Sequence, residues 1–319
     1  MFKSCVLAFA FLLSSAHCLV AAGDEGVSGG QFLRIGVGAK ESALGEAGAV
    51  VSGAQSLFYN PAGINDTAGT EVTASYASWV MDTGYSSLAL AKKGAGGAYG
   101  LGVNYFSVPS IDEYDKYGSK LSGSYSVMDM AVTAGYGREL VPGMNWGVNV
   151  KYISSRLDTN TASAVAADAG LKYEAIPGSL TLGFAAQNVG TRMRFNREGD
   201  PLPLNLKIGG QYMLKFSEDS SLRKDVSFFT DVNELRDSGV YASFGVDMSV
   251  HYSNGNSFSV RGGYKTDVGD RNAGAALGLG VNTPAYTIDY AYSFMGDLGQ
   301  VHRISLGLRF DGEAAKKDI

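Results

Sequence analysis

Histidine side chains offer little catalytic chemistry in this chain. Outside the first 22 residues there are only two, His251 and His302. A hydrolase needs a nucleophile next to an oriented general base. His302 alternates in phase with apolar neighbours, and His251 alternates in phase with polar neighbours at the end of an expected strand. Two distant histidines and scattered acids also lack metal-ligand spacing, so the residues predict neither an enzyme nor a metal site.

Glycine-rich runs do not predict a nucleotide cofactor. Residues 36–42 (GVGAKES) superficially resemble a phosphate-binding loop, but one residue, not four, separates their glycines. Ala39 and Glu41 also interrupt the required Gly-Lys-Ser/Thr succession. Residues 278–280 lie in an alternating strand with no helix after them, so a dinucleotide fingerprint also fails. We therefore expect no cofactor, and the net charge of −5 gives no support to a nucleic-acid partner.

Inward-facing charged residues are the other candidates for chemistry. We interpret them as lining a water-filled lumen, where they could define a permeation path or bind a plug. The alternative is a solvated interior in which these ions merely pair with one another. The candidates are Lys151, Lys207, Asp247, Arg261, Asp289, Arg303 and Arg309, together with Asp129 and Asp231.

The elements that position these charges are strands. In the last of them Ile304, Leu306 and Leu308 alternate with Arg303 and Arg309, the period-2 pattern of a strand with one apolar face. Fourteen such segments recur, an even number, and most approach the length of a tilted membrane-crossing strand. They lie near 70–79, 83–92, 98–107, 125–138, 143–153, 163–173, 178–188, 204–214, 224–232, 240–251, 256–264, 273–281, 285–294 and 301–310.

This pattern predicts an all-β protein, a transmembrane antiparallel β-barrel of about 14 strands. A soluble β-sandwich would show the same alternation, but it would not need so many tyrosines at strand ends. The connections also favour a barrel, because short turns with proline or glycine alternate with the long, polar connections 108–124 and 189–203. The stretch 215–223 is the longest exception among the expected short turns.

The ends of the chain predict export. Residues 1–22 have the pattern of a signal peptide, followed by an N-terminal segment (23–69), the barrel (70–310) and a periplasmic tail (311–319). Both cysteines lie in the leader, and lipidation at Cys18 is the alternative. No later apolar stretch reaches about 18 residues, so a membrane location requires a closed barrel, which we expect in the outer membrane.

The segment before the barrel is rich in glycine and alanine rather than in alternating strands. We expect a short helix over 42–49, and the segment ends in Asn60-Pro61-Ala62-Gly63. Small residues can pack closely against the inner wall of a wide barrel. The prediction is a luminal hatch or plug with these four residues as its motif, and the alternative is a periplasmic tail.

Several blocks resemble the PorV/PorQ family within the wider FadL-like group. They are residues 32–40 (FLRIGVGAK), 60–63 (NPAG), 185–190 (AAQNVG), 202–204 (LPL), 289–292 (DYAY), 296–299 (GDLG) and 302–306 (HRISL). Lys40, Glu46 and the pair at 54–55 depart from the family pattern. The resemblance implies a barrel with one of two functions: passage of fatty acids or other hydrophobic compounds, or export of secreted protein cargo.

The predicted function is therefore an outer-membrane transport or export component and not an enzyme. Expected partners are outer-membrane lipid together with either secreted cargo and secretion-system components or hydrophobic small molecules such as fatty acids. Apolar residues on the long connections are candidate contacts, although they could equally fold over the barrel mouth. A structural porin-like barrel and an outer-membrane lipid hydrolase acting through His251 are more distant alternatives.

Overall fold

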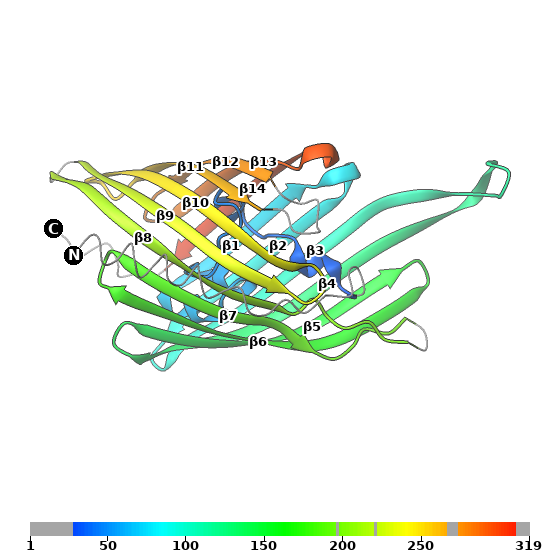
Figure 1. Cartoon of the computed structure of the whole chain (residues 1–319), viewed down its shortest axis with the longest axis horizontal. Helices are drawn as coiled ribbons and strands as arrows, with labels where there is room; N and C mark the ends of the chain where they lie inside the picture. The colour runs from blue at the N-terminus through cyan, green and yellow to red at the C-terminus, as the bar shows by residue number, and fades with distance from the viewer. Residues whose placement is uncertain (1–27, 196–197, 220–221, 267–273, 311–319) are drawn as a thin grey trace.

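Fourteen antiparallel strands close into a barrel in the computed structural model, which describes residues 28–195, 198–219, 222–266 and 274–310 (Figure 1). The predicted leader with Cys18 and the predicted tail at 311–319 lie outside the described residues. The first and last strands pair from Thr70↔Phe310 to Ser78↔His302 and so leave no open sheet edge. The prediction of a fourteen-strand antiparallel barrel is confirmed. Its strands are β1 (Thr70–Ser78), β2 (Gly84–Gly94), β3 (Gly97–Tyr114), β4 (Lys120–Val141), β5 (Met144–Leu157), β6 (Asn160–Ile176), β7 (Leu180–Gly190), β8 (Asn205–Asp219), β9 (Leu222–Leu235), β10 (Gly239–Tyr252), β11 (Ser257–Lys265), β12 (Gly274–Asn282), β13 (Tyr286–Phe294) and β14 (Gln300–Phe310).

Each wall strand turns large apolar side chains outward and small or polar ones inward. On β5, Val148, Val150 and Tyr152 are exposed on the outer face, whereas Asn149 and Lys151 are buried inside. An apolar outer face over a polar interior is the arrangement that a bilayer-spanning barrel requires.

The two ends of the barrel differ. One end, here the turn side, carries short connections such as Pro142-Gly143 and Pro177-Gly178. The other end, the loop side, carries the short 3-10 helices η5 (Val80–Asp82) and η6 (Gly296–Leu298) and the irregular connection 191–204. In Figure 1 the turn side is at the left and the loop side at the right.

Two expected loops are largely strand. The connection predicted at 108–124 is a continuation of β3 and β4, paired through Ile111↔Tyr125 and Asp112↔Ser124 and closed by a Lys120–Asp112 ion pair of 2.6 Å. It projects beyond the rest of the barrel at the right of Figure 1. The stretch 215–223 is likewise mostly strand, because β8 continues to Asp219 and β9 begins at Leu222.

Residues 28–69, here called the luminal segment, lie inside the barrel. They contain η2 (Gln31–Arg34), α2 (Ala39–Ala43), η3 (Ala54–Phe58) and η4 (Pro61–Asp66). The helix expected over 42–49 is wrong, because α2 ends at Ala43 and the backbones of Gly45 and Glu46 are left-handed, with φ of 67° and 64°. A left-handed pair cannot continue an α-helix.

No helix in the described part of the chain has the length and apolar character needed to cross a membrane.

Candidate functional site

Asn60 fixes the end of the luminal segment against the wall. Its side-chain oxygen accepts from the Ala62 amide at 3.1 Å and so caps η4, in which Pro61 occupies the first position. The same side chain donates to Ala49 O at 2.6 Å and to Leu171 O of β6 at 3.0 Å. One buried amide therefore joins two parts of the segment to a wall strand.

Glycines on the wall permit this close approach. A Cβ on Gly170 would lie 2.0 Å from Asn60 Oδ1, and one on Gly147 would lie 2.3 Å from Pro61 O. Within the segment, a Cβ on Gly63 would lie 1.8 Å from Val51 O. Part of the chain's glycine content thus serves contact between the segment and the wall.

Asp231 of β9 provides a second attachment. Its Oδ2 accepts hydrogen bonds from the amides of Gly48 at 2.6 Å and Ala49 at 2.8 Å. The carboxylate is 1% exposed, and Lys207 Nζ lies 4.0 Å from it. Charge-assisted bonds of this kind are stronger than neutral ones, so they hold the middle of the segment in place.

Tyr59 joins the middle of the segment to its N-terminal part. Its hydroxyl accepts from the Val37 amide at 2.8 Å and donates to Val37 O at 2.7 Å, and Lys207 Nζ lies 4.9 Å from its ring centroid. Burial, reinforced by the nearby Glu41 and Glu46, raises the pKa of Tyr59 well above its ordinary value. The phenol therefore stays protonated and can keep both hydrogen bonds.

A cavity lined half by hydrophobic and half by polar or charged side chains lies on the loop side of the segment. This loop-side cavity has a volume of about 290 Å³ and is lined by the hydrophobic side chains of Phe32, Ile35, Trp79, Phe106 and Met295. Its polar lining residues are Gln31, Arg34, Glu46, Asp129 and Lys265. An apolar cavity of roughly 150 Å³ is sufficient to hold benzene. The loop-side cavity is thus large enough for a small aromatic molecule.

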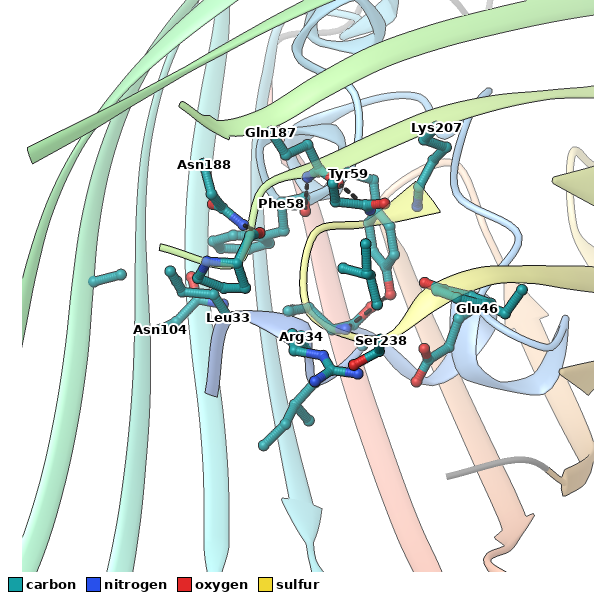
Figure 2. Close-up of a pocket in the computed structure, with 18 of the residues that line it drawn as sticks. Leu33, Arg34, Glu46, Phe58, Tyr59, Asn104, Gln187, Asn188, Lys207 and Ser238 are labelled. Atoms are coloured by element: carbon teal, nitrogen blue, oxygen red, sulfur yellow. Dashed lines mark hydrogen bonds between the residues drawn. The ribbon is translucent and has the colours of Figure 1, made fainter. Parts of the chain in front are cut away.

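A smaller crevice lies against the segment and shares Arg34, Ile35, Glu46 and Lys265 with the loop-side cavity. This inner crevice has a volume of about 60 Å³. Figure 2 shows its lining: Gln187, Asn188 and Lys207 from the wall, and Leu33, Phe58 and Tyr59 from the luminal segment. Gln187 donates to Phe58 O at 3.0 Å. The shared lining residues connect the loop-side cavity to this narrower crevice.

Ion pairs surround these two spaces. Lys265 Nζ lies 2.8 Å from Glu46 Oε2, and Arg34 Nη1 lies 3.7 Å from Asp237 Oδ1. Burial opposes ionisation of Glu46, but Lys265, with smaller effects from Arg303 and Lys207, holds its pKa below the ordinary value. The segment is therefore held on the loop side by charges that remain ionised at neutral pH.

The turn side of the luminal segment faces a more polar space than the loop side does. A cavity of about 320 Å³, here the turn-side cavity, is lined mostly by polar and charged residues. Among them Arg261 binds two carboxylates, with Nε 2.6 Å from Asp247 Oδ2 and Nη1 2.5 Å from Asp289 Oδ1. Burial raises the pKa of Glu41, on the segment above this cavity, to about 7.

The structure places all seven predicted luminal charges inside the barrel, but in separate groups. Asp247, Arg261, Asp289 and Arg309 line the turn-side cavity, whereas Lys151 and Lys207 line the inner crevice. Arg303 lies over the Trp79 ring at 5.7 Å, and its Nη2 has no hydrogen-bond partner among the described residues. They therefore do not form a single path.

Sequence patterns missed several partners of these charges. Lys151 pairs with Asp168 at 2.8 Å and contacts Asn188 at 2.9 Å. Alanine occupies both faces of β6 around Asp168, so alternation there gives no inward direction. Glu46 lies in the irregular luminal segment, where no period exists to assign it. Only three-dimensional packing brings these residues together.

Neither histidine has the surroundings of a general base. His251 Nε2 lies 3.1 Å from Asp225 Oδ2, and in the described chain no serine hydroxyl is hydrogen-bonded to its ring. His302 is on the outer face, where its Nδ1 lies 2.8 Å from the Tyr290 hydroxyl. Within the described ranges no three His, Cys, Asp or Glu side chains gather as a metal site.

No family model matches the sequence, and no curated protein matches it. Solved structures do. The monoaromatic hydrocarbon channel CymD is 13% identical, with a TM-score of 0.57 over 86% of this chain and 98% of that one. The toluene transporter TbuX of Ralstonia pickettii is 14% identical, with a TM-score of 0.58 over 86% and 98%. The toluene transporter TodX of Pseudomonas putida is 12% identical, with a TM-score of 0.55 over 85% and 96%. At these identities the shared property is the fold.

Proposed function

We propose that this protein is an outer-membrane channel for small hydrophobic compounds, in which the luminal segment acts as a hatch. The loop-side cavity carries this proposal, because aromatic and aliphatic side chains supply half of its lining and form a surface that an apolar solute can contact. An apolar solute gains free energy by leaving water for such a surface. The fold shared with CymD, TbuX and TodX supports the same class of solute.

The position of the luminal segment supports a gating role. It lies between the loop-side cavity and the turn-side cavity and is held by Asn60, Asp231 and Glu46. Passage along the lumen requires these contacts to loosen, whereas the wall strands can stay paired. Residues 60–63 are proposed as the fixed end of this hatch and Lys151, Lys207 and Arg303 as luminal charges beside the solute.

Uptake by purified protein in proteoliposomes whose outer leaflet is lipopolysaccharide tests this function, because a plain phospholipid bilayer is no barrier to an apolar solute. We expect wild-type protein to admit toluene faster than protein-free vesicles do, and to give no comparable gain for a sugar of similar size. Phe106→Asp, which places a charge in the loop-side cavity, should reduce toluene uptake. Ser259→Asp is the matched control, because it also places a charge in the lumen but in the turn-side cavity. Phe228→Asp would not serve, because Phe228 faces lipid. Equal uptake of toluene by vesicles with and without protein would contradict the proposal.

A second candidate is a component of protein export, as the resemblance to PorV/PorQ implies. The projecting part of β3 and β4 favours it, because Tyr114 and Tyr117 are exposed there at 58% and 80%. Removal of residues 110–123 should then abolish binding of secreted cargo while the barrel stays folded. Co-purification of exported proteins from outer membranes, lost in this deletion, would support export over solute passage.

A further inference from the structure

Aromatic side chains from three parts of the chain meet at the loop-side cavity. Phe32 of η2 is buried in the hydrophobic cluster against which Trp79, before η5, and Phe106 of β3 pack, and all three line the cavity. An aromatic solute can pack its ring against such a surface. The faces of aromatic rings also attract a positive charge.

A carboxylate lies next to this aromatic surface. Asp129 of β4 is the cross-strand neighbour of Phe106 and lines the same cavity. Cross-strand neighbours on one face of an antiparallel pair have Cβ atoms about 4.5–5.5 Å apart. The ring of Phe106 and the carboxylate of Asp129 can therefore contact the same small molecule.

The other charged residues of the cavity lining have partners of opposite charge. Lys265 Nζ lies 2.8 Å from Glu46 Oε2, so these two lining residues neutralise each other. Arg34 Nη1 lies 3.7 Å from Asp237 Oδ1. These two pairs leave the charge of Asp129 as the one to be balanced.

Asp129 has no cationic partner in the described ranges of the chain. The Ser155 hydroxyl donates a hydrogen bond to its Oδ1, whereas its Oδ2 has no hydrogen-bond partner there. Arg303 lies 5.7 Å from the centroid of the Trp79 ring, but it does not line the cavity. A half-buried carboxylate is poorly solvated, so a cation that enters the cavity gains a partner there.

A protonated aromatic amine carries both groups that this wall can bind. Its ring packs against Phe32 and Trp79, while its ammonium group donates a charge-assisted hydrogen bond to Asp129 beside the ring of Phe106. The volume of about 290 Å³ leaves room for an aminomethyl group on a benzene ring. An aromatic acid of the same shape would instead bring two carboxylates together, which repel each other.

We propose that the loop-side cavity selects protonated aromatic amines and that Asp129 is the residue that determines this specificity. The proposal rests on the proposed channel function for the passage of the solute, and it adds a substrate class and the residue that recognises it. Neutral hydrocarbons still bind, because they contact the same aromatic side chains, but they leave Asp129 without a partner.

Trp79 provides a direct measurement of binding. The chain has two tryptophans, and Trp146 lies on β5 near the turn side, so Trp146→Phe leaves Trp79 as the sole fluorescent reporter. This protein, in non-ionic detergent at pH 7, is titrated with benzylamine, benzyl alcohol and benzoate, which share a ring and differ in charge. We expect benzylamine to bind about tenfold more tightly than benzyl alcohol, and benzoate to bind most weakly. Equal affinities for benzylamine and benzyl alcohol would overturn the proposal.

Variants of Asp129 test whether this residue causes the preference. Asp129→Asn keeps the shape and removes the charge, so it should lower the affinity for benzylamine to that for benzyl alcohol, and Asp129→Glu should restore most of the preference. Asp158→Asn is the matched control, because Asp158 is exposed in the loop-side turn between β5 and β6 and does not line the cavity. Folding of each variant is checked by the mobility of unheated protein on an SDS gel. A tenfold preference that persists in folded Asp129→Asn would overturn the proposal.

Uptake separates this proposal from the channel function. In proteoliposomes with a lipopolysaccharide outer leaflet, benzylamine should inhibit toluene uptake by wild-type protein, and about tenfold more benzylamine should be needed with Asp129→Asn. If no toluene enters at all, the channel function fails, but a tenfold preference in the Trp79 titration that is lost in Asp129→Asn still supports the amine site. Toluene uptake without any preference for benzylamine would keep the channel and overturn the amine site.

Discussion

One carboxylate oxygen of Asp231 accepts hydrogen bonds from the amides of both Gly48 and Ala49, so this residue connects the luminal segment to the wall. Each hydrogen bond to a charged group contributes about 1.5–3 kcal/mol. Asp231→Ala should therefore raise the exchange rate of these two amides by about two orders of magnitude, as measured by hydrogen–deuterium exchange.

Asp225→Ala is the control for this change. Asp225 is a buried acid on the same strand, β9, but its partners are Arg223 and His251 rather than the luminal segment. It should leave the exchange of Gly48 and Ala49 unchanged. Equal protection in Asp231→Ala and wild-type protein would show that the segment is held by other contacts.

We predict that Glu41 makes the packing of the luminal segment against the wall depend on pH. Burial raises its pKa from 4.5 to about 7, opposed by Lys40 and Arg261 and reinforced by Asp289. A raised carboxyl pKa favours the seated state most below pH 4.5, and this advantage falls as pH rises to about 7. The change is at most about 3 kcal/mol.

We expect amides of α2 to lose protection between pH 5 and pH 7.5, after correction for intrinsic exchange, and to change little above that. Glu41→Gln should remove this dependence, because an amide does not titrate in this range. Glu46, with its lowered pKa, acts below pH 4.5 and so in a separate window. If amide protection in Glu41→Gln depended on pH in the same way as in wild type, another group would be responsible for the pH effect.

The alternation of residues in the sequence predicts which way a charged side chain points better than it predicts which residue that side chain pairs with. Alternation correctly turns Lys151 and Arg261 inward, because both lie in strands where apolar residues mark the other face. It does not identify Asp168, which lies among alanines, or Glu46, which follows the left-handed Gly45. Pairing between distant strands leaves no local signal in the sequence.

At the scale of elements, the close contact between η4 and the wall depends on glycines, which have no side chain. A methyl group on Gly170 would meet Asn60 Oδ1 at 2.0 Å and Pro61 Cδ at 3.0 Å. Overpacking of this kind costs about 1–3 kcal/mol. Gly170→Ala should therefore unseat the luminal segment rather than open the barrel.

Limited trypsin digestion of folded protein measures this unseating at Arg34 and Lys40. We expect cleavage to be about tenfold faster in Gly170→Ala than in wild type. Gly96→Ala, in a turn where an added Cβ meets nothing within 4 Å, is the matched control and should cleave as wild type does. Unchanged cleavage in Gly170→Ala would mean that η4 has room to shift.

Strand number and order follow from the sequence, but strand ends and the luminal segment do not. Period-2 alternation holds wherever one face meets lipid, and it locates all fourteen strands. It fails beyond Val108, because the pairing of β3 with β4 shifts in register between Val108 and Ile111 and the alternation is interrupted there. It also fails within residues 28–69, where left-handed residues end α2 early.

At the scale of the whole molecule, aromatic side chains lie on the loop side of the lumen and polar or charged side chains predominate on the turn side. The loop-side cavity is lined by Phe32, Trp79 and Phe106, whereas the turn-side cavity contains Arg261 and its two carboxylates. The luminal segment separates these environments. The proposed channel function therefore predicts that a hydrophobic solute binds on the loop side first and that movement of the luminal segment controls its further passage.

The measurement that tests this account most directly is toluene uptake with the hatch locked to the wall. Ala43 of α2 packs against Ala291 of β13, and residues 23–319 contain no native cysteine, so Ala43→Cys with Ala291→Cys offers one defined disulfide. The account predicts that the oxidised double variant, in proteoliposomes with a lipopolysaccharide outer leaflet, loses most toluene uptake and that reductant restores it, while each single variant behaves as wild type. Full uptake through the oxidised, fully cross-linked protein would contradict it.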